Sequence, residues 1–347
     1  MEITSLGSEI CQFLKDHPNS SSKEIHNALV KKVSYATVKR ELQDLIAGHL
    51  IVTSGQGRGT KYSLHEGYMI TVPIDPQVYF KEDIDQRHIK NAYDFRLIEI
   101  LTRLESIFTN EEKTRLTAMQ DLFERHVANM SPALYAKEFE RLAIDLSWKS
   151  SQIEGNTYTL LETERLIRDK ITAHGKTKDE ATMVLNHKAA IDFIVEHPES
   201  FDRLSIRTIE EIHSLLISEL NIPRNIRNKR VGITGTNYRP LENEYQITEA
   251  LHDMCKLINH RKFAPEKALL ALILLSYIQP FEDGNKRTAR IICNALLMHD
   301  HYCPLSFRTV DPATFKDATL IFYEQNNLSV VKKIFIEQFE FAVQTYF

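Results

Sequence analysis

Hydrophobic residues recur at helical spacing along most of this chain, and the pattern changes briefly to that of strands near the N-terminus. A first helix is predicted over residues 8–16. Ser22 and Ser34 are each expected to cap a further helix, because a serine hydroxyl can accept hydrogen bonds from the first free N–H groups. The apolar runs 50–52 and 61–64 flank a glycine-rich turn, which predicts two short strands.

Three helices followed by a hairpin resemble a winged helix-turn-helix, and we predict a domain of this type over residues 1–66. Between residues 30 and 65 there are six basic and two acidic side chains. In such a domain the third helix contacts bases and the wing contacts phosphates. The side chains expected to bind DNA are Tyr35, Thr37, Lys39, Arg40, Arg58 and Lys61. A protein-interaction module is the alternative, since the formal net charge of −4 favours no general affinity for nucleic acid.

Composition indicates an ordinary soluble protein of two or three domains, with 347 residues, 43% hydrophobic and 26% charged. The most apolar stretch, 268–278, is too short to cross a bilayer, so no membrane partner is expected. The N-terminus lacks the pattern of a secretory signal. The four scattered cysteines favour neither disulfides nor zinc, and we expect a cytoplasmic protein.

A short polar loop lies between two apolar helices, one predicted over 266–278 and the next from about Asn285 to 298. Since the first N–H groups of a helix have no partner within it, they form an anion site together with the helix dipole. Arg287 and Arg290 are three residues apart and would project from one helix face, which suits a polyphosphate. Asp283 is placed to hold Mg²⁺.

The loop is similar to the signature of the Fic family, His-x-Phe-x-(Asp or Glu)-Gly-Asn-(Gly or Lys)-Arg-x-x-Arg. Every specified position is matched except the first, where this chain has Gln279. The resemblance implies that the loop binds ATP with Mg²⁺ and that AMP is transferred to a hydroxyl of a target protein. It implies Mg²⁺ binding by Asp283, phosphate binding by Asn285, the amides of Gly284 and Lys286, Arg287 (β-phosphate) and Arg290 (γ-phosphate), and anchoring of the loop by Phe281.

Gln279 stands where the family has its general base. An amide can orient a hydroxyl but cannot take its proton, and general-base catalysis contributes roughly 10²–10⁴ in rate. None of the histidines His187, His213 and His299 is expected to replace it, because His187 and His213 belong to other helices and His299 lies far along the following one. We therefore predict that AMP transfer is weak or absent. A natural pseudoenzyme, a divergent reaction on a phosphate ester and a deliberately inactivated variant all remain open.

A second motif lies upstream, on a helix predicted from Ser131 to about residue 153. Ser150, Glu154 and Gly155 resemble the pattern (Ser or Thr)-x-x-x-Glu-(Gly or Asn) of the family's inhibitory helix. We expect Glu154 to pair with Arg290, through both carboxylate oxygens if geometry allows, and to block the γ-phosphate position. The chain would thus be autoinhibited.

Residues 231–241 resemble the family's flap, a β-hairpin that pairs with a target segment by strand addition. The flap residues are Thr234, Gly235, Thr236, Asn237 and Tyr238. A mere surface hairpin is the alternative.

The predicted fold is mainly α: an all-helical Fic domain with a small β-hairpin flap, preceded by an α+β winged helix. The predicted domains are 1–66, a connector over 67–92 and the Fic-type domain over 93–347, with the inhibitory helix at about 132–154 and the core at about 200–347.

Two alternative functions remain open at this stage. One is a catalytically inactive nucleotide-binding regulator with a DNA-binding winged helix. The other is removal of AMP from a modified protein, with Glu154 positioning water, although Gln279 also disfavours that reaction. The sequence leaves the target protein and a possible homodimer undecided.

Overall fold

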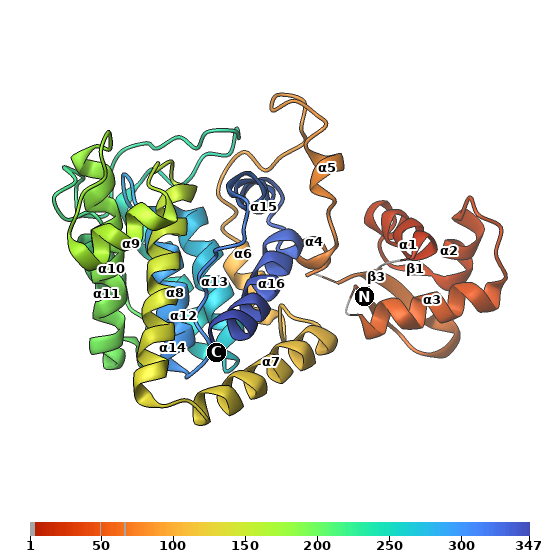
Figure 1. Ribbon diagram of the computed structural model, residues 1–347. Helices are drawn as coiled ribbons and strands as arrows, with labels where there is room; N and C mark the ends of the chain where they lie inside the picture. Colours follow the sequence, from red (N-terminus) through yellow and green to blue (C-terminus); the bar gives the residue numbers. More distant parts are fainter. Residues whose placement is uncertain (1–3, 49, 66) are drawn as a thin grey trace.

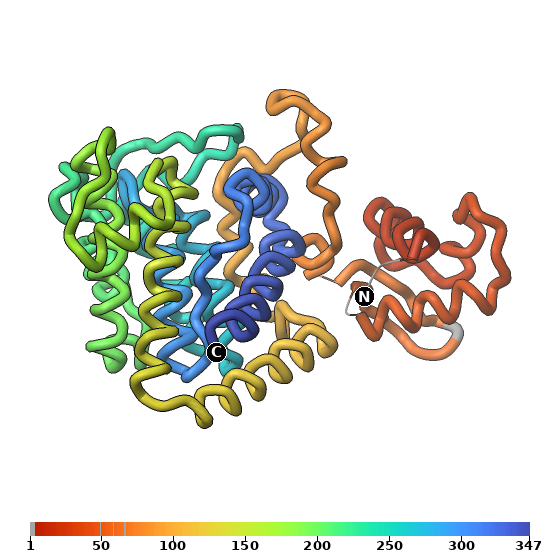
Figure 2. The backbone as a smooth tube through the Cα atoms, viewed as in Figure 1, coloured from red at the N-terminus to blue at the C-terminus, as the bar shows by residue number. Residues whose placement is uncertain are grey.

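The chain forms a small N-terminal unit and a larger helical body (Figures 1 and 2). The computed structural model describes residues 4–48, 50–65 and 67–347. The end of the predicted 1–66 domain, residue 66, lies outside the described residues. The N-terminal unit consists of α1 (Ser5–Asp16), β1 (Ser20–Ser21), α2 (Ser22–Ala28), α3 (Tyr35–Ala47), β2 (Ile51–Ser54), the 3₁₀ helix η1 (Gly57–Gly59) and β3 (Lys61–Leu64).

The helices of this unit begin at capping serines. Ser34 caps α3 through a hydrogen bond from Thr37 N–H, as predicted. Ser22 does not cap α2, so that prediction was wrong by one residue. Ser21 does so instead, because Glu24 lies three residues after it and completes a reciprocal capping box. Ser22 is buried as the first helical residue.

The two predicted strands, β2 and β3, are present, and β1 adds a third. The sheet is antiparallel with strand order β1-β3-β2, and β1 pairs Ser20 with Tyr62 and Ser21 with Lys61. A strand of two residues is too short to leave an alternating pattern, which explains why the sequence did not predict it. Residues of all three helices and of β2 and β3 form a hydrophobic core separate from that of the helical body.

The helical body holds the helices from α6 onward. They are α6 (Leu97–Arg103), α7 (Asn110–Ala128), α8 (Pro132–Ile153), α9 (Leu160–Asp169), α10 (Lys178–Glu196), η2 (Pro198–Phe201), α11 (Ile206–Leu216), α12 (Glu244–His260), α13 (Ala264–Ile278), α14 (Asn285–His299), α15 (Pro312–Gln325) and α16 (Ser329–Tyr346). The fold is thus mainly α-helical with one small antiparallel sheet, as predicted. Among the described residues, no helix is long and apolar enough to cross a membrane.

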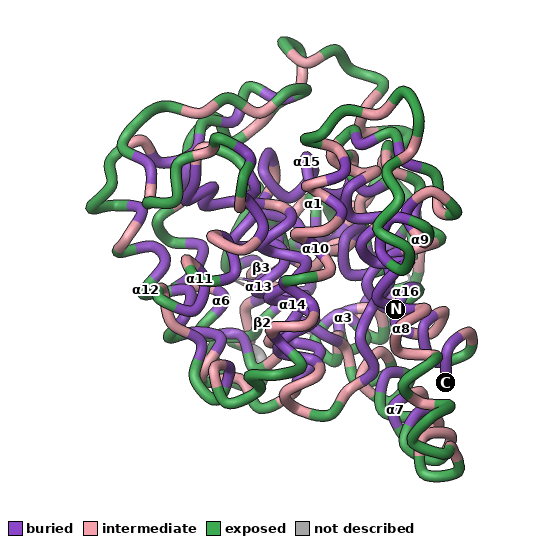
Figure 3. The backbone as a smooth tube through the Cα atoms, turned by 60° about the vertical axis from the view of Figure 1, so that its left-hand side comes forward, coloured by how far each residue is buried: buried purple, intermediate pink, exposed green. Residues whose placement is uncertain are grey.

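The helices α13 and α14 form the centre of this body. Every side chain from Ala264 to Ile278 except that of Lys267 is buried, which is why this stretch of the sequence is apolar on all sides. Helix α13 packs against α12, α14 and α15, and α14 also packs against α8, α10 and α11 (Figure 3). The loop between α13 and α14 is therefore held from several directions.

The segment predicted as a connector packs against α15 and contains α4 (Tyr68–Thr71) and α5 (Pro76–Tyr79). Arg87 forms an ion pair with Glu324 of α15 at 3.1 Å, with side chains 7% and 0% exposed. The Tyr79 hydroxyl donates a hydrogen bond of 2.6 Å to the same carboxylate. The connector is thus attached to the helical body by a buried charge pair.

The predicted β-hairpin at residues 231–241 is not present, and that part of the fold prediction was wrong. The described segment has a turn at 234–235 and a single bridge, in which Arg239 pairs with Ala92 in parallel. Arg239 N–H donates to Asn91 O at 3.0 Å, so the second half of the segment pairs with the connector and not with the first half. Alternating small and β-prone residues suggested a hairpin, but the pairing partner of this segment lies in the connector.

The start of α14 requires a glycine. Gly284 has φ +81°, and a Cβ added there would lie 3.3 Å from atoms of His213 and of Ile217. We expect Gly284→Ala to lower the free energy of unfolding by about 1–3 kcal/mol, measured by chemical denaturation. Gly232→Ala is the matched control, since no atom lies within 4 Å of its added Cβ, and its effect should stay within about 0.5 kcal/mol. Equal effects would contradict the requirement.

At the C-terminal end of α14, His299 should make the stability of the protein depend on pH. His299 lies between Asp300, at 2.8 Å, and Asp202, at 2.9 Å. Burial acts to lower the pKa of His299, but the hydrogen bonds and charges of the two carboxylates outweigh it and raise that pKa above 6.5. The stabilisation should be complete below about pH 6.5 and be lost as the pH rises through the raised pKa.

Urea denaturation between pH 5.5 and 8.5 tests this prediction. The free energy of unfolding should fall by less than about 1 kcal/mol over this pH range, because the carboxylate of Asp202 is exposed. The variant His299→Gln should remove this part of the pH dependence. An unchanged profile in that variant would show that another group is responsible.

Candidate functional site

The loop between α13 and α14 is shaped by the side chain of Asn285. Its Oδ1 accepts a hydrogen bond from Phe281 N–H at 2.8 Å, and its Nδ2 donates to Phe281 O at 2.8 Å and to Gln279 Oε1 at 3.0 Å. Phe281 is fully buried and stacks on His213 with ring centroids 3.6 Å apart. The loop is thus closed by one amide and anchored by one ring.

Helix α14 begins without a side-chain cap. Gly284 is the N-cap residue, and the first hydrogen bond of the helix runs from Thr288 N–H to Gly284 O at 2.9 Å. The N–H groups of residues 285–287 consequently have no acceptor within the helix. They carry the partial positive charge of the helix N-terminus, which favours an anion.

Two buried arginines project from the first turns of α14. Arg287 is 2% exposed and donates from Nη2 to Asp283 Oδ2 at 3.2 Å. Arg290 is fully buried and donates from Nε to Ser150 Oγ at 2.7 Å and from Nη2 to Ser150 O at 3.0 Å. In each arginine, Nη1 is buried and has no hydrogen-bond partner among the described residues. Two buried donors therefore remain available beside an open helix N-terminus.

Glu154 reaches this site from the end of α8. Its Oε1 accepts from Arg290 Nη2 at 2.7 Å, a single contact and not a bidentate one. Burial acts to raise the pKa of Glu154, but the charges of Arg290 and Lys286 outweigh it and hold that pKa below its usual value. The carboxylate is therefore ionised at neutral pH and neutralises Arg290.

The end of α8 has the geometry that places this carboxylate. Gly155 has φ +93°, and its N–H donates to Gln152 O while the N–H of Asn156 donates to Ser151 O. This pair of hydrogen bonds is the Schellman motif, which needs a left-handed residue just after the helix. The helix end predicted at residue 153 agrees with the observed bounds.

Gln279 is engaged at both ends of its amide. Nε2 donates to Ser276 O at 2.7 Å, Oε1 accepts from Asn285, and the residue is 7% exposed with φ 52°. Its backbone carbonyl accepts from Nε of Arg227 at 2.6 Å. Arg227 is 2% exposed, and its own N–H donates to Pro280 O at 2.9 Å. The sequence analysis missed Arg227, since it is one of four basic residues between 224 and 230 and nothing distinguishes it there.

Two histidines lie at the site, His213 against the loop and His187 against Ser150 of α8, although the sequence analysis expected neither to replace the missing base. His213 Nε2 donates to Asp283 O at 3.0 Å, and burial lowers the pKa of His213 to about 4. Nε2 of His187 contacts Ser150 Oγ. Burial lowers the pKa of His187 well below its usual value, and the charges of Arg287 and Arg290 act in the same direction. Both imidazoles are therefore neutral at pH 7, and both have structural contacts.

The predicted flap residues lie between the connector and α13. Arg87 Nη2 donates to Gly235 O at 2.8 Å, and Asn237 Nδ2 donates to Asp85 Oδ1 at 2.9 Å. The Tyr238 hydroxyl donates to the carbonyl of Tyr277, one residue before the end of α13, at 3.0 Å. Thr234 is in the turn and exposed, whereas Thr236 directly follows the turn and is buried. The structure therefore brings the flap and the connector together, a contact that the sequence did not indicate.

The residues predicted to bind DNA lie in the N-terminal unit, apart from this loop. They are distributed over α3 and the β2–β3 hairpin: Tyr35, Thr37, Lys39, Arg40, Arg58 and Lys61. Nζ of Lys61 is 3.1 Å from Glu24 Oε2, and Nζ of Lys39 donates to the Tyr62 hydroxyl at 3.5 Å. Arg40 is exposed, and the side chain of Arg58 lies outside the described part of the chain. DNA binding stays a prediction.

Asp283 is the residue predicted to hold Mg²⁺. Its side chain is 66% exposed, and Oδ2 contacts Arg287. Over residues 4–48, 50–65 and 67–347, no group of three or more His, Cys, Asp and Glu side chains is arranged to hold a metal ion. A metal at Asp283 would consequently need further oxygen ligands from a bound phosphate.

Comparisons with known proteins relate this helical body to one family. A model of the Fic/DOC family matches residues 203–297, which include the loop and most of α14. The protein adenylyltransferase Fic of Nematostella vectensis is 30% identical over 171 residues, covering 47% of this chain and 39% of that protein. The protein adenylyltransferase Fic of Drosophila willistoni is 24% identical over 313 residues, covering 84% of this chain and 62% of that protein.

The solved structures agree at the level of the fold. Fic-1 (residues 134–508) from C. elegans superposes with a TM-score of 0.60 and 22% identity, covering 68% of this chain and 72% of that one. A Fic family protein from Desulfovibrio desulfuricans superposes with a TM-score of 0.56 and 18% identity, covering 68% of this chain and 74% of that one. The curated relatives are matched over 31% to 62% of their own length. The chain thus has a mainly α-helical Fic fold, its residues 203–297 match the model of the Fic/DOC family, and it is similar in sequence to the protein adenylyltransferases called Fic.

Proposed function

We propose that this chain binds ATP with Mg²⁺ at the loop of residues 281–290 and has the machinery of a protein adenylyltransferase, inhibited by Glu154 and impaired by Gln279. One observation carries the proposal. Arg287 and Arg290 each retain a buried N–H group without a partner among the described residues, next to the uncapped start of α14. Buried donors of this kind are costly unless an anion satisfies them, and a phosphate chain has the matching charge and oxygen atoms.

The residues present fit a nucleotide with its metal ion. The amides of residues 285–287 would hold phosphate oxygens, Arg287 the β-phosphate and Arg290 the γ-phosphate. The exposed carboxylate of Asp283 would exchange Arg287 for Mg²⁺, which would neutralise charge on the phosphates. The names of the relatives, protein adenylyltransferases, support ATP as the nucleotide.

In AMP transfer, a target hydroxyl oxygen forms a bond to the α-phosphorus while the bond to the β-phosphate oxygen breaks and pyrophosphate leaves. The hydroxyl proton must pass to a base. Gln279 has no basic atom, and its amide is committed to Ser276 and Asn285. His187 and His213 are neutral, but both are held in packed contacts away from the solvent. The reaction would therefore rely on phosphate positioning alone.

The ion pair between Glu154 and Arg290 explains the inhibition. Arg290 can neutralise either the Glu154 carboxylate or a γ-phosphate, and the two anions would repel each other at the same guanidinium. A productively placed ATP must therefore displace Glu154. Release of this side chain is the step that would activate the site.

An ATP-binding regulator without turnover is the second candidate. The hydrogen bonds of Gln279 favour it, because the glutamine is built into the closed loop and leaves the phosphate-binding atoms in place. In this case the nucleotide would act on a partner of the N-terminal unit. The two candidates differ in whether AMP is ever transferred.

Two substitutions separate these functions. We expect Glu154→Gly to raise the affinity for a non-hydrolysable ATP analogue with Mg²⁺ by about ten-fold, measured by calorimetry, because Arg290 becomes free. In that background, Gln279→His should raise the transfer of label from α-labelled ATP to protein by roughly 10²–10⁴, because a base is restored.

Gln279→Asn in the same background is the matched control and should give no gain, since it supplies no base. Transfer by the protein with Gln279 at the rate of the histidine variant would contradict the mechanism. Unchanged affinity after Glu154→Gly would contradict the inhibition. Failure to bind the analogue in every variant would remove the proposed function.

A further inference from the structure

The end of α8 is held by α10 at two places, one on each side of Glu154. Before it, Ser150 Oγ contacts Nε2 of His187. After it, Thr157 donates to the carboxylate of Glu180, from N–H at 2.9 Å and from the hydroxyl at 2.6 Å. The two α10 residues are seven positions apart, or about 10 Å along the helix. Glu154 therefore projects from a segment fixed at both ends by one neighbouring helix.

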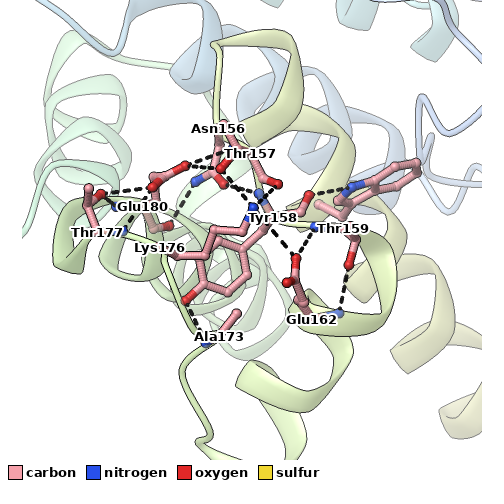
Figure 4. A network of polar contacts seen from close by, with 10 residues as sticks. Asn156, Thr157, Tyr158, Thr159, Glu162, Ala173, Lys176, Thr177 and Glu180 are labelled. Atoms are coloured by element: carbon pink, nitrogen blue, oxygen red, sulfur yellow. Dashed lines mark hydrogen bonds and ion pairs between the residues drawn. The ribbon is translucent and has the colours of Figure 1, made fainter.

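The carboxylate of Glu180 divides its two oxygens between two tasks (Figure 4). Oε2 accepts from the N–H and the hydroxyl of Thr177, both at 3.0 Å, which caps α10. Oε1 accepts both hydrogen bonds from Thr157. The cap of α10 is thus complete without the second oxygen, and a capping role alone does not explain the contact with Thr157.

The neighbouring helix α9 offers a direct comparison. Its capping box uses Glu162, whose Oε2 accepts from Thr159 N–H at 2.8 Å. Beyond its own cap residue, the ion partner of Glu162 among the described residues is Lys176, at 3.9 Å. Glu162 and Glu180 therefore both complete the capping box of their own helix, and Glu180 in addition accepts two hydrogen bonds from Thr157.

Other contacts reinforce the attachment of the same segment (Figure 4). Asn156 Nδ2 donates to the backbone carbonyl of Glu180 at 2.8 Å, and Lys176 Nζ donates to the carbonyl of Thr157 at 2.7 Å. The hydrogen bonds from Thr157 and Thr177 hold the pKa of Glu180 at about 2, so the carboxylate stays ionised at physiological pH. The segment from Asn156 to Thr157 is thus bound to a permanent charge.

We propose that Glu180 is a positioning residue for the inhibitory Glu154: by holding Thr157 against the start of α10 it keeps the end of α8, and with it the Glu154 carboxylate, at Arg290. The inference rests on the proposed function, because it requires that Glu154 competes with a nucleotide phosphate. A change that frees Thr157 lets the end of α8 move away from Arg290. The inhibited state is then less populated, although Glu154 itself is intact.

The variant Glu180→Gln tests this role, because it keeps the shape of the side chain and places an N–H group against the donors of Thr157 or Thr177. We expect the affinity for a non-hydrolysable ATP analogue with Mg²⁺ to rise by about ten-fold, in the same direction as with Glu154→Gly. Thr157→Val, which removes the hydroxyl and leaves the cap of α10 untouched, should also raise the affinity. If these substitutions only damaged the folded structure, the affinity for the ATP analogue would fall instead.

The 347-residue chain contains an intrinsic fluorescent reporter for these titrations. Trp148 is the only tryptophan of the sequence, lies on α8 and donates from Nε1 to Tyr158 O at 3.0 Å. Its fluorescence should change when the end of α8 moves, and calorimetry gives the affinity independently. Glu162→Gln is the matched control, with a similar loss of capping. Its affinity for the analogue should change far less than that of Glu180→Gln, because among the described residues Glu162 is linked to Thr157 only through Lys176, at 3.9 Å.

A double variant separates the inference from the proposed function. In the Glu154→Gly background, Glu180→Gln should add no further gain, because both substitutions act on the same contact. Higher affinity after Glu154→Gly but not after Glu180→Gln or Thr157→Val would overturn the positioning role and leave the proposed inhibition standing. No gain after Glu154→Gly would overturn both. Equal gains from Glu162→Gln and Glu180→Gln would show a general effect of helix capping.

Discussion

The buried charge of Arg290 is the constraint on which the rest of the site depends. A guanidinium with no exposed surface must have an anionic partner, because leaving a buried charge alone costs about 3–5 kcal/mol. Glu154 supplies that anion from a helix 136 positions away in the sequence. The C-terminal end of α8 therefore has to lie beside Arg290, and Gly155 has to turn the chain directly after Glu154. Helix α10 holds the residues that follow this turn. A ligand that takes over the charge must replace Glu154, so under the proposed function nucleotide binding and inhibition exclude each other at Arg290.

Much of this arrangement could be predicted from local sequence. The helices α13 and α14 follow from apolar runs interrupted by Gly284, and the end of α8 follows from Glu-Gly-Asn after a long amphipathic stretch. The pairing of Glu154 with Arg290 was expected only because both motifs resemble those of one family. Neither residue has a local pattern that identifies its partner.

Contacts that join distant segments could not be predicted in this way. Arg227 holds the carbonyl of Gln279, but its segment has no periodicity and several other basic residues. The flap was expected to pair with itself, whereas Arg239 pairs with the connector. In both cases the decisive interaction is a hydrogen bond to a backbone carbonyl, and a carbonyl is present at every position of the chain. The identity of its donor is therefore a property of the three-dimensional fold.

Gln279 supports the shape of the loop with a side chain that is not a base. Its amide fills the donor and acceptor positions inside the turn, so the loop remains closed around Asn285. The conformation of the loop at this position therefore does not require a basic side chain.

The buried pair of Arg87 and Glu324 affects how the protein can be divided. Motifs place the boundary of the helical domain near residue 93, yet Glu324 is fully buried and receives its charge partner from residue 87. A fragment cut at that boundary would lose both the counterion of Glu324 and the part of the connector that packs against α15. A recombinant fragment that is to keep both the ion pair and the hydrogen bond from Tyr79 must therefore begin upstream of Tyr79, although every motif of the helical domain lies downstream of that residue.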